Sequence, residues 1–135
     1  GVTCSALVLD WDKAVEFKAA HGLPGVDLLL GAEVVHEKSH AQGLLAAIKT
    51  LLAPDGMAVM LNGAPHHRFG GKEFEEIANA DPCLEIESHD VNSADALAQS
   101  VEAQRLVAGL ESMETGQLVL RVHHIRLRRA DQSAV

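Results

Sequence analysis

Runs of aliphatic residues alternate with amphipathic stretches along this chain. The consecutive leucines Leu28, Leu29 and Leu30 lie in a compact apolar run, Val26–Ala32, which predicts a β-strand buried on both faces. The other runs with the length and composition of strands are 2–9, 57–61, 83–86 and 117–127. In the last of these, apolar residues fall at both parities, so we expect it to be covered on both sides.

The most regular helical pattern lies between Ser39, which we predict as the N-cap, and the turn residues Pro54-Asp55-Gly56. Its apolar residues recur with helical spacing and form one stripe. They are Leu44, Leu45, Ile48, Leu51 and Leu52. Further helices are predicted at 13–20, around Phe74, Ile77 and Ala78, and from Ser93 to Leu110.

Strands that alternate with amphipathic helices indicate βαβ units. The expected fold class is therefore α/β, a three-layer Rossmann-like arrangement with a mostly parallel sheet and helices on both faces. One helix connects 26–32 to 57–61, which predicts adjacent parallel strands joined by a right-handed crossover. We expect a single domain at 1–127 and a flexible tail at 128–135.

The 135 residues carry a formal net charge of -8, which disfavours a nucleic-acid partner for the body of the domain. No apolar run approaches the roughly 18 residues of a transmembrane helix, so no membrane partner is expected. Cys4 and Cys83 are far apart and lack metal-ligand spacing, which favours a reducing, cytoplasmic compartment, with an organelle as the open alternative. Because the sequence opens on Gly1, we expect a processed or partial product.

Three stretches carry a family resemblance. They are Val-Leu-Asp-Trp-Asp at 8–12, Val-Asp-Leu-Leu-Leu-Gly-Ala-Glu-Val-Val-His at 26–36, and Leu-Leu-Ala-Ala-Ile-Lys-Thr-Leu-Leu-Ala-Pro-Asp-Gly at 44–56. In this order they resemble the C-terminal portion of a class I (seven-β-strand) S-adenosylmethionine-dependent methyltransferase, of the protein-lysine methyltransferase-like family. The resemblance is strongest over 2–80 and implies strands three to seven of that fold.

The resemblance also implies roles for four residues. Trp11 corresponds to the tryptophan that packs on the cofactor adenine, and Ala32 to a residue that lines the cofactor site. Glu33 and His36 fall at the catalytic positions, where the family usually has Asp and Tyr or Phe. The reaction holds a desolvated amine in line with the sulfonium methyl, which a carboxylate such as Glu33 could orient without a metal.

The family's glycine-rich loop and the acidic residue after its second strand are absent from this sequence. S-adenosyl-L-methionine is therefore expected as cofactor only when an N-terminal half supplies these groups. The missing first two strands would leave one edge of Val26–Ala32 without a neighbour, so we expect a chain or subunit outside these residues to cover it. The alternative is that the strand at 2–9 moves in beside it.

Two functions follow as expectations. The first is methylation of a protein side chain, most simply that of lysine. In this case the chain is the C-terminal part of the enzyme and an N-terminal half completes it. The alternative is a degenerate, non-catalytic subunit that serves a structural or interaction role in a larger assembly. The partners are a protein substrate or partner subunits. A third possible function, that of a different nucleotide-binding domain, would need a phosphate-binding loop, which the sequence lacks.

Other residues of types that can bind metals or act as nucleophiles are expected to have no such function here. Adjacent residues on a strand point to opposite faces, so the pairs His66-His67 and His123-His124 do not predict a metal site. Cys4 and Ser5 lie in no nucleophile elbow. The arginines near the end are expected to be solvated, with a docking role as the alternative; they are Arg121, Arg126, Arg128 and Arg129.

Overall fold

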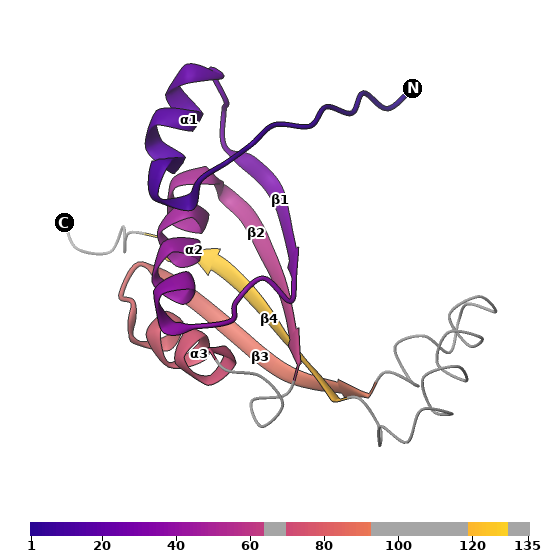
Figure 1. Cartoon of the computed structure of the whole chain (residues 1–135), viewed down its shortest axis with the longest axis vertical. Helices are drawn as coiled ribbons and strands as arrows, with labels where there is room; N and C mark the ends of the chain where they lie inside the picture. Colours follow the sequence, from indigo (N-terminus) through magenta and orange to yellow (C-terminus); the bar gives the residue numbers. More distant parts are fainter. Residues whose placement is uncertain (64–69, 93–118, 130–135) are drawn as a thin grey trace.

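The computed structural model describes residues 1–63, 70–92 and 119–129 (Figure 1). A short 3-10 turn, η1, at Trp11–Lys13 leads into the first of three described helices. The helices are α1 (Ala14–Ala20), α2 (Lys38–Leu51) and α3 (Gly71–Ala80). The strands are β1 (Val26–Ala32), β2 (Leu52–Gly63), β3 (Leu84–Asn92) and β4 (Val119–Leu127).

The four described strands form one sheet in the order β1-β2-β4-β3. β1 and β2 are adjacent and parallel, which confirms the prediction for 26–32 and 57–61. β4 is antiparallel to both β2 and β3, so β1, β2 and β3 point in one direction and β4 in the other. The expectation of a mostly parallel sheet is therefore wrong: the described sheet is mixed, with one parallel pair, because β4 enters between two strands that run opposite to it.

The core of the described part lies on one face of this sheet. Inward-facing residues of β2, β3 and β4 pack against α2 and α3, while α1 packs against α2 (Figure 1). The buried residues include Leu45, Ile48, Ala58, Met60, Phe74, Ala78, Leu84 and Ile125. Within the described residues the helices thus form one layer, and the expected layer of helices on the opposite face is not found among them.

The opposite face of β1 is exposed. Leu28 and Leu30 have exposed fractions of 56% and 70%, so the expectation of a strand buried on both faces is wrong for the described part of the protein. Side chains alternate along a strand, and the described helices cover only the face to which Leu29 points. An apolar surface therefore remains open on the other side.

The junction of α2 and β2 differs from the sequence-based expectation. α2 begins at Lys38 with Glu37 in the N-cap position, so Ser39 lies inside the first turn rather than at the cap. β2 starts at Leu52 directly after α2, without the expected turn at 54–56. Val26 pairs with Leu52 and Leu28 with Met57, so the residues between Leu52 and Met57 form a bulge. Tight turns and β-bulges favour the same residue types, which is why a turn was expected where the structure has a bulge.

The segment 2–9 forms no strand. Its backbone pairs with none of the described strands, and Val2 and Val8 have exposed fractions of 92% and 95%. The alternative in which this segment closes the sheet beside β1 is therefore wrong. The helix predicted at 13–20 is present as η1 and α1, whereas the helix predicted from Ser93 lies outside the described residues.

Three of the four arginines near the C-terminus, Arg121, Arg128 and Arg129, hydrogen-bond to other residues of the protein, whereas all four were expected to be solvated. Arg121 donates hydrogen bonds to Glu75 at 2.7 and 3.1 Å and to Asp90 at 3.1 Å, which joins β4 to α3 and β3. Arg128 donates to the Leu84 carbonyl, and Arg129 pairs with Asp55. None of the described helices is long and apolar enough to span a membrane.

Candidate functional site

A tight turn presents Trp11 beside α2. The Asp10 carboxylate accepts a hydrogen bond from the Asp12 backbone N–H at 3.1 Å, and the Lys13 backbone N–H donates to the Asp10 carbonyl at 2.9 Å. Asp side chains commonly stabilise turns by bonding to backbone two residues further on. The turn therefore fixes the direction in which the indole leaves the backbone.

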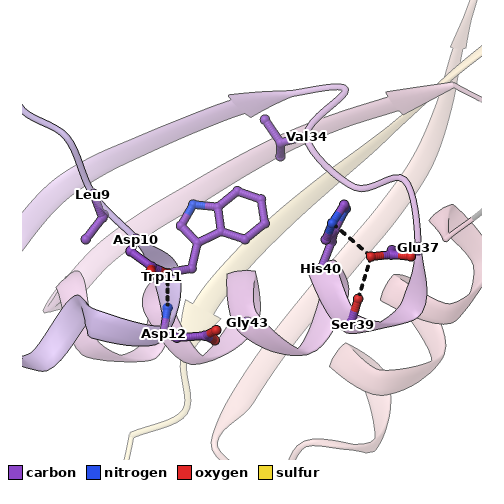
Figure 2. Close-up of a pocket in the computed structure, with 9 residues that line it drawn as sticks. All are labelled: Leu9, Asp10, Trp11, Asp12, Val34, Glu37, Ser39, His40 and Gly43. Atoms are coloured by element: carbon purple, nitrogen blue, oxygen red, sulfur yellow. Dashed lines mark hydrogen bonds and ion pairs between the residues drawn. The ribbon is translucent and has the colours of Figure 1, made fainter.

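Gly43 gives this turn room against α2. A Cβ added at Gly43 would lie 3.4 Å from Asp12 Oδ1 and 3.8 Å from Trp11 Cβ, which are ordinary contact distances. A longer side chain at this position would fill the space beside the indole. Because Gly43 has no side chain, that space stays open (Figure 2).

His40 forms the next part of the wall. Its ring lies edge-on to the Trp11 ring, with centroids 6.3 Å apart and planes at 85°. Its Nε2 is 3.1 Å from Glu37 Oε1, and the same carboxylate oxygen accepts a hydrogen bond from the Ser39 hydroxyl at 2.8 Å (Figure 2). The first turn of α2 thus orients the imidazole by hydrogen bonding.

Together these residues surround a pocket of about 490 Å³. Its lining comes from the 9–12 segment, the connection after β1 and the first turns of α2 (Figure 2). The lining residues are Leu9, Asp10, Trp11, Asp12, Val34, Glu37, Ser39, His40 and Gly43. Ligand pockets are commonly about 300–1,000 Å³. Open α/β sheets bind ligands beyond the carboxyl ends of their strands, and this pocket lies next to the end of β1.

An apolar slot of about 180 Å³ adjoins this pocket. The two cavities share Leu9, Trp11 and Val34. The rest of the slot is formed by β1, α2 and β2, with Leu29 and Met60 among its walls. The site therefore has a polar opening and an apolar base.

The chemistry of the opening favours a ligand with hydrogen-bond donors. Asp10, Asp12 and Glu37 supply carboxylate oxygens, which accept hydrogen bonds when ionised. Trp11 supplies an aromatic face, on which a flat ring can stack or a cation can rest. A heteroaromatic group that carries N–H and hydroxyl donors matches both features.

Glu33 ties the ends of two strands together. Its backbone N–H donates to the Leu61 carbonyl at 2.8 Å, and its carboxylate accepts a hydrogen bond from the Gly63 backbone N–H. Its φ of 54° lies in the left-handed region, which is uncommon for a residue with a side chain. The side chain is thus held at the carboxyl edge of β1 and β2.

Of the four residues singled out by the resemblance, only Trp11 is among the lining residues of the pocket. Ala32 is exposed at the end of β1, in register with Leu61 of β2. His36 is also exposed, and its ring centroid lies 6.2 Å from that of His40. Ala32, Glu33 and His36 therefore belong to the same connection as Val34 and Glu37 without lining the cavity.

The histidine pair on β4 points in two directions, as adjacent strand residues do. His123 is 1% exposed; its Nδ1 lies 2.7 Å from the Ser88 hydroxyl, and its ring packs near Phe74. Burial lowers the pKa of His123 below its ordinary value, so the neutral ring is favoured. His124 instead stacks on His89 with centroids 5.3 Å apart. His66-His67 lies outside the described residues.

The metal-ligating residue types are dispersed in the part of the chain that the structure describes. No three of its His, Cys, Asp or Glu residues are grouped so that they could hold a metal ion.

Sequence reasoning missed most of the pocket. Glu37, His40 and Gly43 recur every three residues along the start of α2, next to the apolar stripe. That spacing places them on one side of the helix, and it is the feature of the sequence from which this wall of the pocket could have been predicted. The apolar stripe alone identifies the buried face and leaves a polar neighbour of that face unnoticed.

Neither protein-family models nor curated protein sequences match this chain.

Proposed function

We propose that this chain is the C-terminal part of a class I S-adenosylmethionine-dependent methyltransferase of the protein-lysine methyltransferase-like kind. In this proposal the pocket beside Trp11 receives the adenosine group of the cofactor. The observation that carries the proposal is the position of Trp11, the single tryptophan of the chain, on an open pocket of about 490 Å³ next to the carboxyl end of β1.

The pocket residues fit an adenosine group chemically. The Trp11 indole can stack on the adenine ring, and the carboxylates of Asp10, Asp12 and Glu37 can accept hydrogen bonds from its exocyclic amine. The groups that bind the methionine and the ribose in the family that this chain resembles are absent from this sequence. The chain therefore contributes one wall of the cofactor site.

The direction of the strands supports a reaction centre at one edge of the sheet. β1, β2 and β3 point the same way, so their carboxyl ends meet at the edge that also holds Glu33. When bound, the cofactor supplies an electrophilic methyl group, and the contribution of this chain is to position groups around it. Glu33 is held in place there by its bonds to β2.

One observation favours the second candidate, a non-catalytic subunit. The Glu33 carboxylate is already bound to the Gly63 backbone N–H, which gives it a structural use at the junction of β1 and β2. A domain that keeps the adenosine pocket and uses Glu33 in this way could bind without turnover. Methyl transfer to a lysine-containing protein, measured with the whole protein that contains this chain, separates the two candidates.

Binding of adenosine to the pocket can be tested in the 135-residue chain by fluorescence, because Trp11 is the single tryptophan of the chain. Adenosine and S-adenosylhomocysteine at millimolar concentration are expected to quench the Trp11 fluorescence, whereas methionine is expected to have no effect. A millimolar dissociation constant corresponds to about -4 kcal/mol, which is reasonable for stacking with a few hydrogen bonds.

Two variants on α2 provide the control. Gly43→Leu fills the space beside Trp11 and should abolish the quenching by adenosine. Ala46→Leu adds a similar side chain at an exposed position of the same helix and should leave it intact. Both changes favour helix formation or leave it nearly unchanged, so loss of folding is not the expected cause. Equal quenching in both variants, or none in the unchanged chain, would contradict the proposed pocket.

A further inference from the structure

An arginine of the sheet holds the middle of α3. Arg121 of β4 donates two hydrogen bonds to the Glu75 carboxylate of α3, at 2.7 and 3.1 Å, and one to Asp90 of β3 at 3.1 Å. Bidentate pairs of an arginine and a carboxylate are stronger than hydrogen bonds between neutral groups, and they fix direction as well as distance. Arg121 therefore ties α3 to the strands that it covers.

His123 lies beside this pair, on the same face of β4 and under α3. Its ring centroid is 5.3 Å from that of Phe74, the residue of α3 that precedes Glu75. Its Nδ1 lies 2.7 Å from the Ser88 hydroxyl, whereas its Nε2 is buried and has no hydrogen-bond partner among the described residues. A protonated imidazole carries an N–H on both nitrogens. The Nε2–H of a protonated His123 would therefore be buried without an acceptor.

Charged and titratable groups of three elements face His123. They are Glu75 of α3, Asp90 of β3, and Arg121 and His124 of β4; β2 places a neutral residue, Met60, opposite His123. Burial is the main reason that the pKa of His123 is lowered, and Arg121 and His124 act in the same direction. The two carboxylates act in the opposite direction, but both are already bound to Arg121. Protonation of His123 is therefore favoured by any movement of α3 that exposes the ring or frees Glu75 from Arg121.

The start of α3 packs on the wall of the pocket beside Trp11. α3 lies next to α2 (Figure 1). A Cβ added at Gly70 would lie 2.8 Å from the Glu37 backbone nitrogen and 3.0 Å from the His36 carbonyl carbon. The Gly70 carbonyl accepts a hydrogen bond from the Phe74 N–H at 2.9 Å, and Glu37 is both the N-cap of α2 and a lining residue of the pocket. A shift at Phe74 is thus transmitted through Gly70 to Glu37.

The opposite end of α3 is anchored independently of His123. Asp81, the C-cap of α3, pairs with Lys49 of α2 and accepts a hydrogen bond from the Cys83 N–H at 2.8 Å. The hydrogen bond from Lys49 is the main reason that the pKa of Asp81 is lowered, so this carboxylate stays ionised in mild acid. Movement of α3 is therefore expected at its N-terminal half, with the Asp81 end as the pivot.

We propose that α3 couples the protonation of His123 to the pocket beside Trp11. With His123 neutral, α3 is closed on the sheet and Gly70 supports Glu37. With His123 protonated, the N-terminal half of α3 moves away from the sheet and the pocket wall loosens. A proton and a ligand that favour different states of one element weaken each other's binding equally. The expected effect on adenosine rests on the proposed function, whereas the coupling between His123 and the pocket wall does not.

Arg121→Met tests the coupling at constant pH. It removes the hydrogen bonds to Glu75, so it should open α3 at pH 7.5 as acid does in the unchanged chain. Amide exchange should become about fivefold faster or more at Phe74, which reports on α3, and at Ala41, whose N–H donates to the Glu37 carbonyl. Adenosine should bind about fivefold more weakly, which is the lower end of the usual coupling between sites.

The matched control is Arg126→Met, at an exposed position on the opposite face of β4. It should leave amide exchange and adenosine affinity unchanged within about twofold. Thermal unfolding shows whether each variant is folded. If Arg121→Met is not, Glu75→Gln replaces it, because this change weakens the same pair from the side of α3.

The pH dependence identifies the titrating group. Between pH 7.5 and 5.5, the fluorescence of Trp11 should change less in His123→Gln than in the unchanged chain, while His124→Gln should behave like the unchanged chain. His40, in the pocket wall, is present in all three proteins, so its own titration does not distinguish them.

Gly70→Ala tests the path between His123 and the pocket. Its added Cβ must displace the Glu37 backbone or the start of α3. The response of Trp11 to pH should therefore be smaller in Gly70→Ala, while the pH slope of unfolding that His123 causes should remain. If thermal unfolding shows that this variant is not folded, Gly70→Asn replaces it, because asparagine tolerates the left-handed conformation of Gly70.

Three results would overturn the proposal. One is exchange at Ala41 that stays unchanged in Arg121→Met, because the pocket wall would then not depend on the pair that holds α3. Another is an equal pH response of Trp11 in His123→Gln and the unchanged chain. The third is an undiminished response in the variant at Gly70. Failure of adenosine to bind would contradict the proposed function alone, since Ala41 and Trp11 report the coupling without a ligand.

Discussion

The carboxylate of Glu33 accepts a hydrogen bond from the backbone N–H of Gly63, and so joins the carboxyl ends of two parallel neighbours, β1 and β2. Glu33 also adopts a left-handed backbone conformation, with φ at 54°. That conformation costs a residue with a side chain roughly 1–2 kcal/mol relative to its ordinary conformations. A stabilising bond and a strained backbone thus coincide at one residue, and substitution can separate them.

We predict that Glu33→Gly is more stable than Glu33→Ala by about 1 kcal/mol. Both substitutions remove the acceptor for the Gly63 N–H, but only glycine relieves the left-handed strain. Glu33→Gln keeps an acceptor and should be the least destabilised of the three. Urea denaturation of the three variants measures the order. Equal stability of the Gly and Ala variants would show that the backbone at this position is unstrained.

A second prediction concerns two glycines with different surroundings. A Cβ at Gly56 would lie 2.5 Å from the Val26 carbonyl oxygen, which is backbone and cannot move aside, so Gly56→Ala should cost about 1–3 kcal/mol. At Gly43, within α2, the nearest contact would be 3.4 Å, so Gly43→Ala should gain up to about 1 kcal/mol from helix propensity. Thermal or urea unfolding of the pair tests both signs. A neutral Gly56→Ala variant would mean that the bulge between β1 and β2 is looser than its geometry indicates.

A third prediction concerns acid sensitivity. Burial lowers the pKa of His123 from its ordinary value of 6.5, while its neighbours Glu75, Arg121 and Asp90 act in both directions. A lowered folded pKa means that the unfolded chain binds the proton more readily. The contribution of His123 to the free energy of unfolding is therefore complete above about pH 6.5. It is lost as the pH falls from there through the lowered pKa that His123 has in the folded protein.

The measurement compares His123→Gln with His124→Gln, a change at the neighbouring position on the opposite face of β4. The free energy of unfolding, measured between pH 7.5 and 5 in roughly half-unit steps, should lose part of its slope in His123→Gln only. His124→Gln should keep the slope of the unchanged chain. The same slope in both variants would indicate that other groups cause the acid sensitivity.

The fourth prediction is that the 135-residue chain does not bind S-adenosylmethionine with micromolar affinity. The groups that bind the methionine and the ribose in the proposed family are absent from this sequence, and stacking on Trp11 supplies only a few kcal/mol against the cost of association. Calorimetry with the cofactor checks this. A micromolar dissociation constant would show that the Trp11 pocket is a complete site without an N-terminal half.

The features that were predicted from sequence depend on local pattern. β1 was predicted with its observed bounds, and the N-cap of α2 was predicted two residues late, at Ser39 instead of Glu37. Both elements could be predicted because an apolar run and a helical stripe are encoded in neighbouring residues. Their parallel arrangement followed from the length of the connection. The position of β4 could not follow in this way, since a strand that enters between β2 and β3 is determined by pairing across distant parts of the chain.

The errors have physical causes as well. The exposure of Leu28 and Leu30 was missed because an apolar residue indicates burial only when a partner is present to bury it. The turn expected at Pro54-Asp55-Gly56 is a bulge, since these residue types suit both. Of the residues that line the Trp11 pocket, only Trp11 was singled out from the sequence, through the family resemblance, and its role in binding a cofactor stays a prediction. His40 and Gly43 could not be identified in this way, because their place in the pocket depends on the packing of the 9–12 segment against α2.

The place of β4 in the sheet also constrains how the domain is assembled. β1, α2 and β2 are consecutive in the chain and can form a pair as soon as they are synthesised. β3 pairs only with β4 among the described strands, so it has no place in the sheet until residues 119–127 have left the ribosome. A nascent chain that stops short of β4 would therefore lose two strands of the sheet rather than one, and Ile125 would be missing from the core that α3 covers.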